Sequence, residues 1–218
     1  MALTRSQLRT RTRSFLKEAT ADYWSDATLE GYLDDAIRVY SSRLGLLTRE
    51  KTANVVSGQY EYALPSDYVI PALAGAVPPQ GYTVAVDGIP LQYLPFQTLQ
   101  MMKGYGSGAG LGTTPQFWTL FNGTGDTTGA VQSLQVLPTP TAGGTGNLRV
   151  AYEAKAAALS ADSSVPVIPE EDHECLPWGA AARAYLERGQ TEEAAIYQTM
   201  FDRRITERLP GGGSAPTQ

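Results

Sequence analysis

The sequence has one cysteine, Cys175, so it cannot form an intramolecular disulfide, and a reducing compartment is the natural setting. It also lacks any run of about 18 apolar residues, which excludes a transmembrane helix and predicts no membrane association. The N-terminus, M-A-L-T-R-S-Q-L-R, has no long apolar stretch before a cleavage site and therefore does not resemble a secretory signal. We expect a soluble protein that is made in the cytoplasm of its host cell.

Motifs for chemistry are also scarce. His173 is the only histidine, so a histidine-based metal cluster is excluded. His173 and Cys175 stand two residues apart and would face different directions on a helix, which predicts a helix-end histidine beside a buried cysteine rather than a catalytic dyad. The glycine-rich stretch 103–115 matches neither G-x-x-x-x-G-K nor G-x-G-x-x-G and is interpreted as a surface or interface loop whose role the sequence leaves open. We expect no cofactor, no metal and no enzymatic activity.

The net charge of −5 disfavours a general nucleic-acid coat, but the charge is unevenly distributed. Residues 1–20 carry five bases and one acid, whereas residues 168–209 carry nine acids and five bases. Oppositely charged ends suit contacts with copies or partners, although two solvated helix faces would show the same pattern. The candidate residues for such charge contacts are Arg5, Arg9, Arg13, Glu170 and Glu171.

Two amphipathic helices are predicted at the N-terminus. The first spans about Thr4 to Ala19 with Thr4 as N-cap. The second begins after a cap at Ser25 or Asp26, and Gly45 is placed to end it in a left-handed conformation. Its apolar residues recur at spacings of three and four, which predicts a buried face. The helical core is therefore assigned to Leu29, Leu33, Ile37 and Tyr40.

From residue 46 to about residue 166 the pattern changes to short strands separated by glycine, proline and threonine turns. Asp87-Gly88 is a strong signal for a two-residue hairpin, and 95–103 is predicted to be one short helix. These features predict a small antiparallel barrel or sandwich. The predicted strands are 52–57, 59–63, 69–77, 82–86, 89–93, 116–121, 133–137 and 148–153.

The C-terminal part returns to helix. Pro169 is placed in a first helical turn, and Pro177 should kink this helix or restart it. Thr191 is the predicted cap of a last helix. The fold class is therefore α+β, with a helical bundle built from the N- and C-terminal helices and an inserted small antiparallel β-barrel or sandwich. The expected segments are 1–48, 49–166, 167–209 and an extended tail, 210–218.

Several of these stretches, taken in order, resemble the head-to-tail adaptor (connector) proteins of tailed bacteriophages. The first is W-S-D-A-T-L-E-G-Y-L-D-D-A-I, which begins at Trp24. It is followed by L-P-S-D-Y, P-Q-F-W-T-L-F, L-Q-V-L-P-T-P, L-R-V-A-Y-E-A and P-V-I-P-E-E-D. The resemblance covers roughly residues 20–209, and it is carried by the order of the motifs rather than by any single one.

The resemblance implies a structural virion protein of the neck, between capsid and tail. Such a protein docks as a ring, dodecameric by the resemblance, beneath the portal protein. There it extends the channel for double-stranded DNA, without sequence-specific contact, and offers a surface to the tail or to a second connector. By the same resemblance, the portal interface would include Phe201, Arg204, Arg208, Gly211, Gly212 and Gly213.

Two other functions compete with the adaptor interpretation. A nucleic-acid-binding virion or accessory protein could contact phosphates through Arg5, Arg9, Arg11 and Arg13, but the net acidity opposes it. A carbohydrate-binding tail or fibre module would account for the aromatic β region, but not for helices at both ends.

Overall fold

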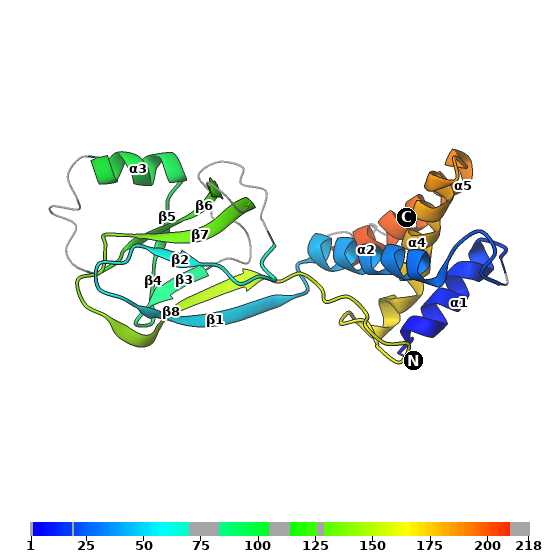
Figure 1. Cartoon of the computed structure of the whole chain (residues 1–218), viewed down its shortest axis with the longest axis horizontal. Coiled ribbons are helices and arrows are strands. Elements are labelled where there is room, and N and C mark those ends of the chain that lie inside the picture. Colours follow the sequence, from blue (N-terminus) through cyan, green and yellow to red (C-terminus); the bar gives the residue numbers. More distant parts are fainter. Residues whose placement is uncertain (1, 19, 70–82, 105–113, 126–128, 210–218) are drawn as a thin grey trace, which may run out of the picture. The chain divides into compact units, whose positions relative to one another are not determined.

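The computed structural model describes residues 2–18, 20–69, 83–104, 114–125 and 129–209 (Figure 1). It divides into two compact units. The helical unit combines Met1–Leu47 with Lys155–Gln218, and the strand unit is Thr48–Ala154. Helices in the first and two sheets in the second confirm the α+β class. None of the helices in the described ranges has both the length and the apolarity that a bilayer crossing requires.

Local sequence signals set the ends of the first two helices. Helix α1 (Arg5–Phe15) begins with a capping box, in which Thr4 accepts from the N–H of Gln7 and the Gln7 side chain accepts from the N–H of Thr4. It ends four residues before the predicted end at Ala19, which lies outside the described residues, because Lys17 adopts a positive φ of 56°. Helix α2 (Asp26–Leu44) starts at the N-cap Ser25 and ends at Gly45, with φ of 58°, as predicted.

The C-terminal half of the helical unit follows the proline signals. A 3-10 helix, η1 (Glu170–Cys175), begins after Pro169, and α4 (Leu176–Glu187) restarts at once with Pro177 in its first turn. Proline is tolerated there because the first N–H groups of a helix have no intrahelical acceptor. The last helix, α5 (Thr191–Arg208), differs from the prediction in its cap. Gln190 holds the N-cap position without a side-chain hydrogen bond, and Thr191 is the first helical residue.

The core of the helical unit lies between α2 and the two long C-terminal helices. Leu29, Leu33, Ile37 and Tyr40 are fully buried. Leu33, Ile37 and Tyr40 share one cluster with apolar residues of the opposite end of the chain, including Leu176, Ala180, Phe201 and Ile205. Leu29 belongs to a second cluster with Trp24, Ala181, Ala184 and Tyr185. Both clusters therefore join residues that are far apart in the sequence.

The strand unit consists of two four-stranded sheets. In one, the order is β1 (Thr48–Val55), β8 (Gly144–Glu153), β3 (Thr83–Val86) and β4 (Ile89–Pro90). In the other, it is β2 (Glu61–Ala63), β7 (Gly129–Leu137), β6 (Phe117–Gly125) and β5 (Gln92–Tyr93). All ladders are antiparallel except β5 with β6. Among the described strands each sheet keeps two edges, so the arrangement is open and not a closed barrel.

The Asp87-Gly88 hairpin forms as predicted, with positive φ at both residues, and joins β3 to β4. The predicted strand 89–93, however, is divided between the two sheets. Ile89 pairs with Val86 in one sheet, and Gln92 pairs in parallel with Phe117 in the other. Helix α3 (Phe96–Gly104) follows and lies over β6, where Phe96 stacks on Phe121 (Figure 1). The first strand runs over 48–55 rather than 52–57. Most of the predicted strand 69–77 and of the loop 103–115 lies outside the described residues.

Truncation of Leu33 tests the placement of the buried face of α2. Leu33→Ala should lower the free energy of unfolding by about 2–5 kcal/mol, because it removes a fully buried side chain and leaves a cavity. Val39→Ala, on the exposed side of the same helix, is the matched control and should change it by less than about 0.5 kcal/mol. Denaturant titration followed by circular dichroism at the helix band measures both. Equal, small effects would show that the wrong face had been assigned to the core.

Candidate interaction surfaces

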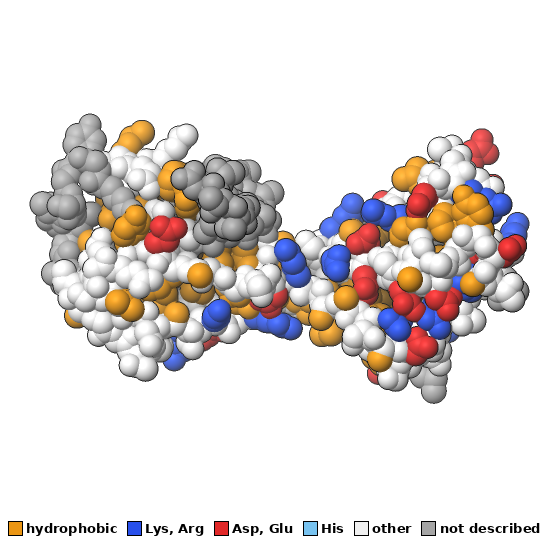
Figure 2. Space-filling model, in the orientation of Figure 1, with side chains coloured by type: hydrophobic (Ala, Val, Ile, Leu, Met, Phe, Trp, Pro, Cys, Tyr) orange, Lys and Arg blue, Asp and Glu red, His pale blue; other side chains and the backbone are white. Residues whose placement is uncertain are grey.

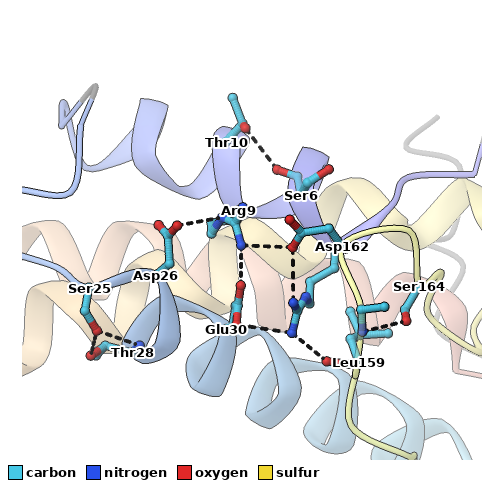
Figure 3. Close-up of polar contacts among 12 residues, drawn as sticks. Ser6, Arg9, Thr10, Ser25, Asp26, Thr28, Glu30, Leu159, Asp162 and Ser164 are labelled. Atoms are coloured by element: carbon cyan, nitrogen blue, oxygen red, sulfur yellow. Dashed lines mark hydrogen bonds and ion pairs between the residues drawn. The ribbon is translucent and has the colours of Figure 1, made fainter.

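Two arginines of α1 are held by carboxylates of the same chain. Arg5 Nη1 lies 3.1 Å from Glu30 Oε2, and Arg5 Nη2 lies 3.1 Å from Asp162 Oδ1. Arg9 Nη1 also lies 3.1 Å from Asp162 Oδ1 and donates to Glu30 (Figure 3). We call Arg5, Arg9, Glu30 and Asp162 the α1 cluster. It joins α1 to α2 and to the irregular segment 155–168.

Backbone hydrogen bonds fix the same segment to α1 and α2. The N–H groups of Arg5 and Ser6 donate to the carbonyls of Ser164 (2.8 Å) and Asp162 (3.2 Å). Leu159 donates its N–H to Asp34 Oδ1 at 3.0 Å and accepts from Arg5 Nη1 at 2.9 Å. Two N–H groups at the start of α1, which have no acceptor within the helix, are thereby satisfied. Segment 155–168 thus belongs to the helical unit.

The third candidate, Arg13, organises the connection between α1 and α2. It is buried and donates to the carbonyl of Trp24 at 2.9 Å and to Asp26 Oδ1 at 2.6 Å. It also donates to the carbonyl of Thr20 and to Glu18, each 3.2 Å away. Glu18 in turn accepts from the N–H groups of Asp22, Tyr23 and Trp24. Burial alone would raise the pKa of Glu18, but these backbone donors and Arg13 hold it below its ordinary value.

The arginines proposed for partner contacts are therefore engaged inside the unit. Arg5, Arg9 and Arg13 each bind carboxylates of this chain, and Arg11 lies 2.9 Å from Glu174. Figure 2 shows the same mixing at the surface, where side chains of both signs lie side by side over the helices. The hypothesis of a phosphate-binding basic helix accordingly receives no support from the described residues, since all four arginines already have partners.

A second cluster joins η1 to α5. The carboxylate of Asp172, only 2% exposed, accepts from Arg204 Nε at 2.9 Å and from Arg208 Nε at 3.0 Å. Arg208 Nη2 also reaches Glu171 Oε1 at 2.5 Å. Two charge-assisted donors offset the cost of removing the Asp172 carboxylate from water.

The residues proposed for the portal interface differ in their exposure. Arg204 and Arg208 keep about a third of their side chains exposed. Phe201 is only 2% exposed and packs near Tyr40, so it contributes to the core. Gly211, Gly212 and Gly213 lie outside the described residues. Glu170 and Glu171 are exposed in the first turn of η1.

The polar atoms of His173 and Cys175 are used for folding. The buried His173 ring accepts from the N–H of Leu3 at Nδ1 (3.0 Å), so Nε2 is the nitrogen that donates to the carbonyl of Ile168 (3.1 Å). Cys175 Sγ donates to the carbonyl of Asp172 at 3.0 Å. No group of three or more histidine, cysteine or acidic side chains within the described ranges is placed to hold a metal ion.

An apolar groove of about 460 Å³ lies between α2, α4 and α5. We call it the α2/α4/α5 groove. Its floor is made of small side chains and Phe201, and its walls carry Val39 and Leu186, which are 41% and 62% exposed. Arg43, Arg183 and Asp35 stand at its rim. The sequence analysis missed this surface, although the alanines and the glycine at 36, 179, 182, 194 and 195 were a signal for closely approaching helices.

The chain is an α+β protein whose helical unit is made from both chain ends and carries exposed apolar side chains. The order of its motifs resembles that of phage head-to-tail adaptors. Comparison with known families bears this out, because the family model described as SU10 adaptor protein matches residues 3–217. The chain belongs to the SU10 adaptor protein family. No curated protein matches it.

The Cys175 thiol should not react in the folded protein. Burial raises its pKa to about 12, and the nearby Asp172 carboxylate acts in the same direction, so the thiol stays protonated at pH 8. An aromatic disulfide reagent should therefore label Cys175 slowly in the native state and at once in denaturant. Rapid labelling without denaturant would contradict its burial.

Strong acid should weaken the hold of the α1 cluster on the first helix. Hydrogen bonds from Arg9 and Arg5 hold the pKa of Asp162 below its ordinary value of about 3.9. The contact is therefore complete above pH 4 and is lost as the pH falls through the lowered pKa. The protection factors of the α1 amides, which are the exchange rates corrected for their intrinsic pH dependence, should fall in that range. In Asp162→Asn the protection factors should already be lower at neutral pH and fall less in acid, and an unchanged fall in acid would contradict this.

Proposed function

We propose that copies of this chain form a ring beneath the portal of the phage head, extend the DNA channel and offer a surface to the tail. The ring is dodecameric by the resemblance, and its place is the neck of the virion. The observation that carries the proposal is the match of the adaptor family over nearly the whole chain, residues 3–217. The partners are the portal protein, a tail or second connector protein and further copies of this chain.

The use of polar groups agrees with a structural rather than an enzymatic role. The histidine, the cysteine and the buried aspartate, which could serve a reaction, are each bound by groups of the same unit. The DNA in the channel would pass close to the ring without sequence-specific contacts. We therefore propose a virion component without catalytic activity.

The end of α5 and the tail that follows it are the proposed portal-binding part. Arg204 and Arg208 both hold Asp172, and about a third of each side chain remains exposed, so a portal carboxylate could share them. Gly211, Gly212 and Gly213 would let the backbone follow a curved partner surface. Phe201 is not included in the proposed portal-binding surface, because its side chain is buried.

Removal of the tail tests the proposal. Deletion of 210–218 should leave the helical unit folded, because Ile205, the last buried apolar residue of α5, stays in place. Circular dichroism checks the fold, and co-sedimentation with purified portal rings measures attachment. We expect the fold to persist and attachment to fall sharply.

A chain with residues 210–218 in scrambled order is the control for tail length. If it attaches like the wild type, the tail acts only as a spacer. Full attachment of the deleted chain, with tails still accepted by DNA-filled heads, would contradict docking through the tail.

A further inference from the structure

The α2/α4/α5 groove combines a floor of small side chains with exposed apolar walls. Ala36, Gly179, Ala182 and Ala194 leave the space, and Val39 and Leu186 stand at the edge in water. Shallow apolar surfaces of this kind accept a pair of projecting apolar side chains.

The chain carries a matching projection on the other side of α5. Ala194, Gln198 and Phe201 follow helical spacing and face the groove. Glu192, Ile196 and Met200, at intervals of four, form a stripe on the opposite face, where Ile196 is 60% and Met200 39% exposed. One copy therefore presents an apolar pair and an apolar groove in opposite directions.

The charges beside the two surfaces are complementary. Arg43 and Arg183 stand at the groove rim with more than half of each side chain exposed. Arg43 pairs with Asp202 and Arg183 lies 3.6 Å from Asp35, so each guanidinium has one carboxylate of its own chain and can be shared with another. Glu192 and Glu193 lie one turn before Ile196, and neither has an ion pair within the described part of the chain. A copy whose Ile196 enters the groove brings unpaired acids to a rim of exposed bases.

We propose that the α2/α4/α5 groove receives the outer face of α5, with Ile196 and Met200, from a second copy of this chain. Because the two surfaces lie on opposite sides of α5, the contact is head-to-tail, and repetition of a head-to-tail contact gives a ring when the rotation closes. The inference rests on the proposed ring and names the surfaces that join its subunits.

Cysteine cross-linking tests the contact directly, because Cys175 is buried and the introduced thiol is the reactive one. Ile196→Cys and Leu186→Cys are prepared as separate full-length variants and treated with a short bis-maleimide, alone and mixed, at the highest soluble concentration. The mixture should give a covalent dimer, and each variant alone should give several-fold less. Ile89→Cys, 60% exposed in the strand unit, replaces Leu186→Cys in the control mixture and should not cross-link.

Charge reversal in the same assay tests the rim. Arg183→Glu in the Leu186→Cys chain should lower the yield several-fold, and Glu192→Arg in the Ile196→Cys chain should restore it. Dimers from one variant alone would show a symmetric contact and overturn the proposal. No mixed dimer, or a yield equal to that of the Ile89→Cys control, would overturn it as well.

The assay contains no portal protein, so its failure is separate from a failure of portal docking. A chain that binds portal rings but gives no mixed dimer would keep the adaptor function and exclude this contact. In a second reaction with purified portal rings added, cross-linking of Leu186→Cys to the portal instead of to Ile196→Cys would assign the groove to that partner and overturn the proposal.

Discussion

The apolar face of α2 has to be covered by helices from the opposite end of the chain. Ile37 and Tyr40 are buried against residues of α4 and α5, which follow more than one hundred residues later. The close approach depends on Gly179, where an added Cβ would lie 3.0 Å from Ala36 Cβ and 3.2 Å from the Phe201 ring. A larger side chain there would push α4 away from both helices. The packing of α2, α4 and α5 against one another depends on this close approach.

Ion pairs between charged side chains hold the remaining segments of the helical unit in place. The α1 cluster holds segment 155–168 across α1 and α2, and Asp172 holds α5 against η1. Such pairs need not add much net stability, because removing the ions from water costs free energy. Their geometry nevertheless allows one arrangement of the segments. With so many charges engaged internally, the exposed apolar side chains are the main surfaces left for the proposed contacts between copies.

Local signals explain the part of the fold that could be predicted from the sequence. Thr4, Ser25, Gly45 and Asp87-Gly88 act on neighbouring backbone groups, and each forms the predicted cap or turn. The period of α2 likewise gave its buried residues, because one helix face is a local property. The division of 89–93 between two sheets was not predictable, since pairing with β6 is set by residues far along the chain.

The candidate surfaces were harder to predict for the same reason. The sequence shows that α1 is rich in arginine, but it does not show which carboxylates these arginines bind. Asp162, which lies 3.1 Å from both Arg5 and Arg9, is more than 150 residues away in the chain. Phe201 and Ile205 lie on one apolar face of α5, and such a face can belong either to the core or to an interface. The contact of Phe201 with Tyr40 assigns it to the core. The groove needs three helices at once, so no stretch of sequence contains it.

The division of the helical unit between the two chain ends also sets an order of events during translation. Helices α1 and α2 leave the ribosome first, and their apolar faces wait until α4 and α5 are made. At roughly 5–20 residues per second, that interval is on the order of ten seconds. The strand unit is continuous in sequence and can fold within it. Nascent chains thus expose the apolar faces of α1 and α2 while they are still attached to the ribosome. At that stage the chains made from one messenger RNA are closest to one another, and chaperones have the largest apolar surface to bind.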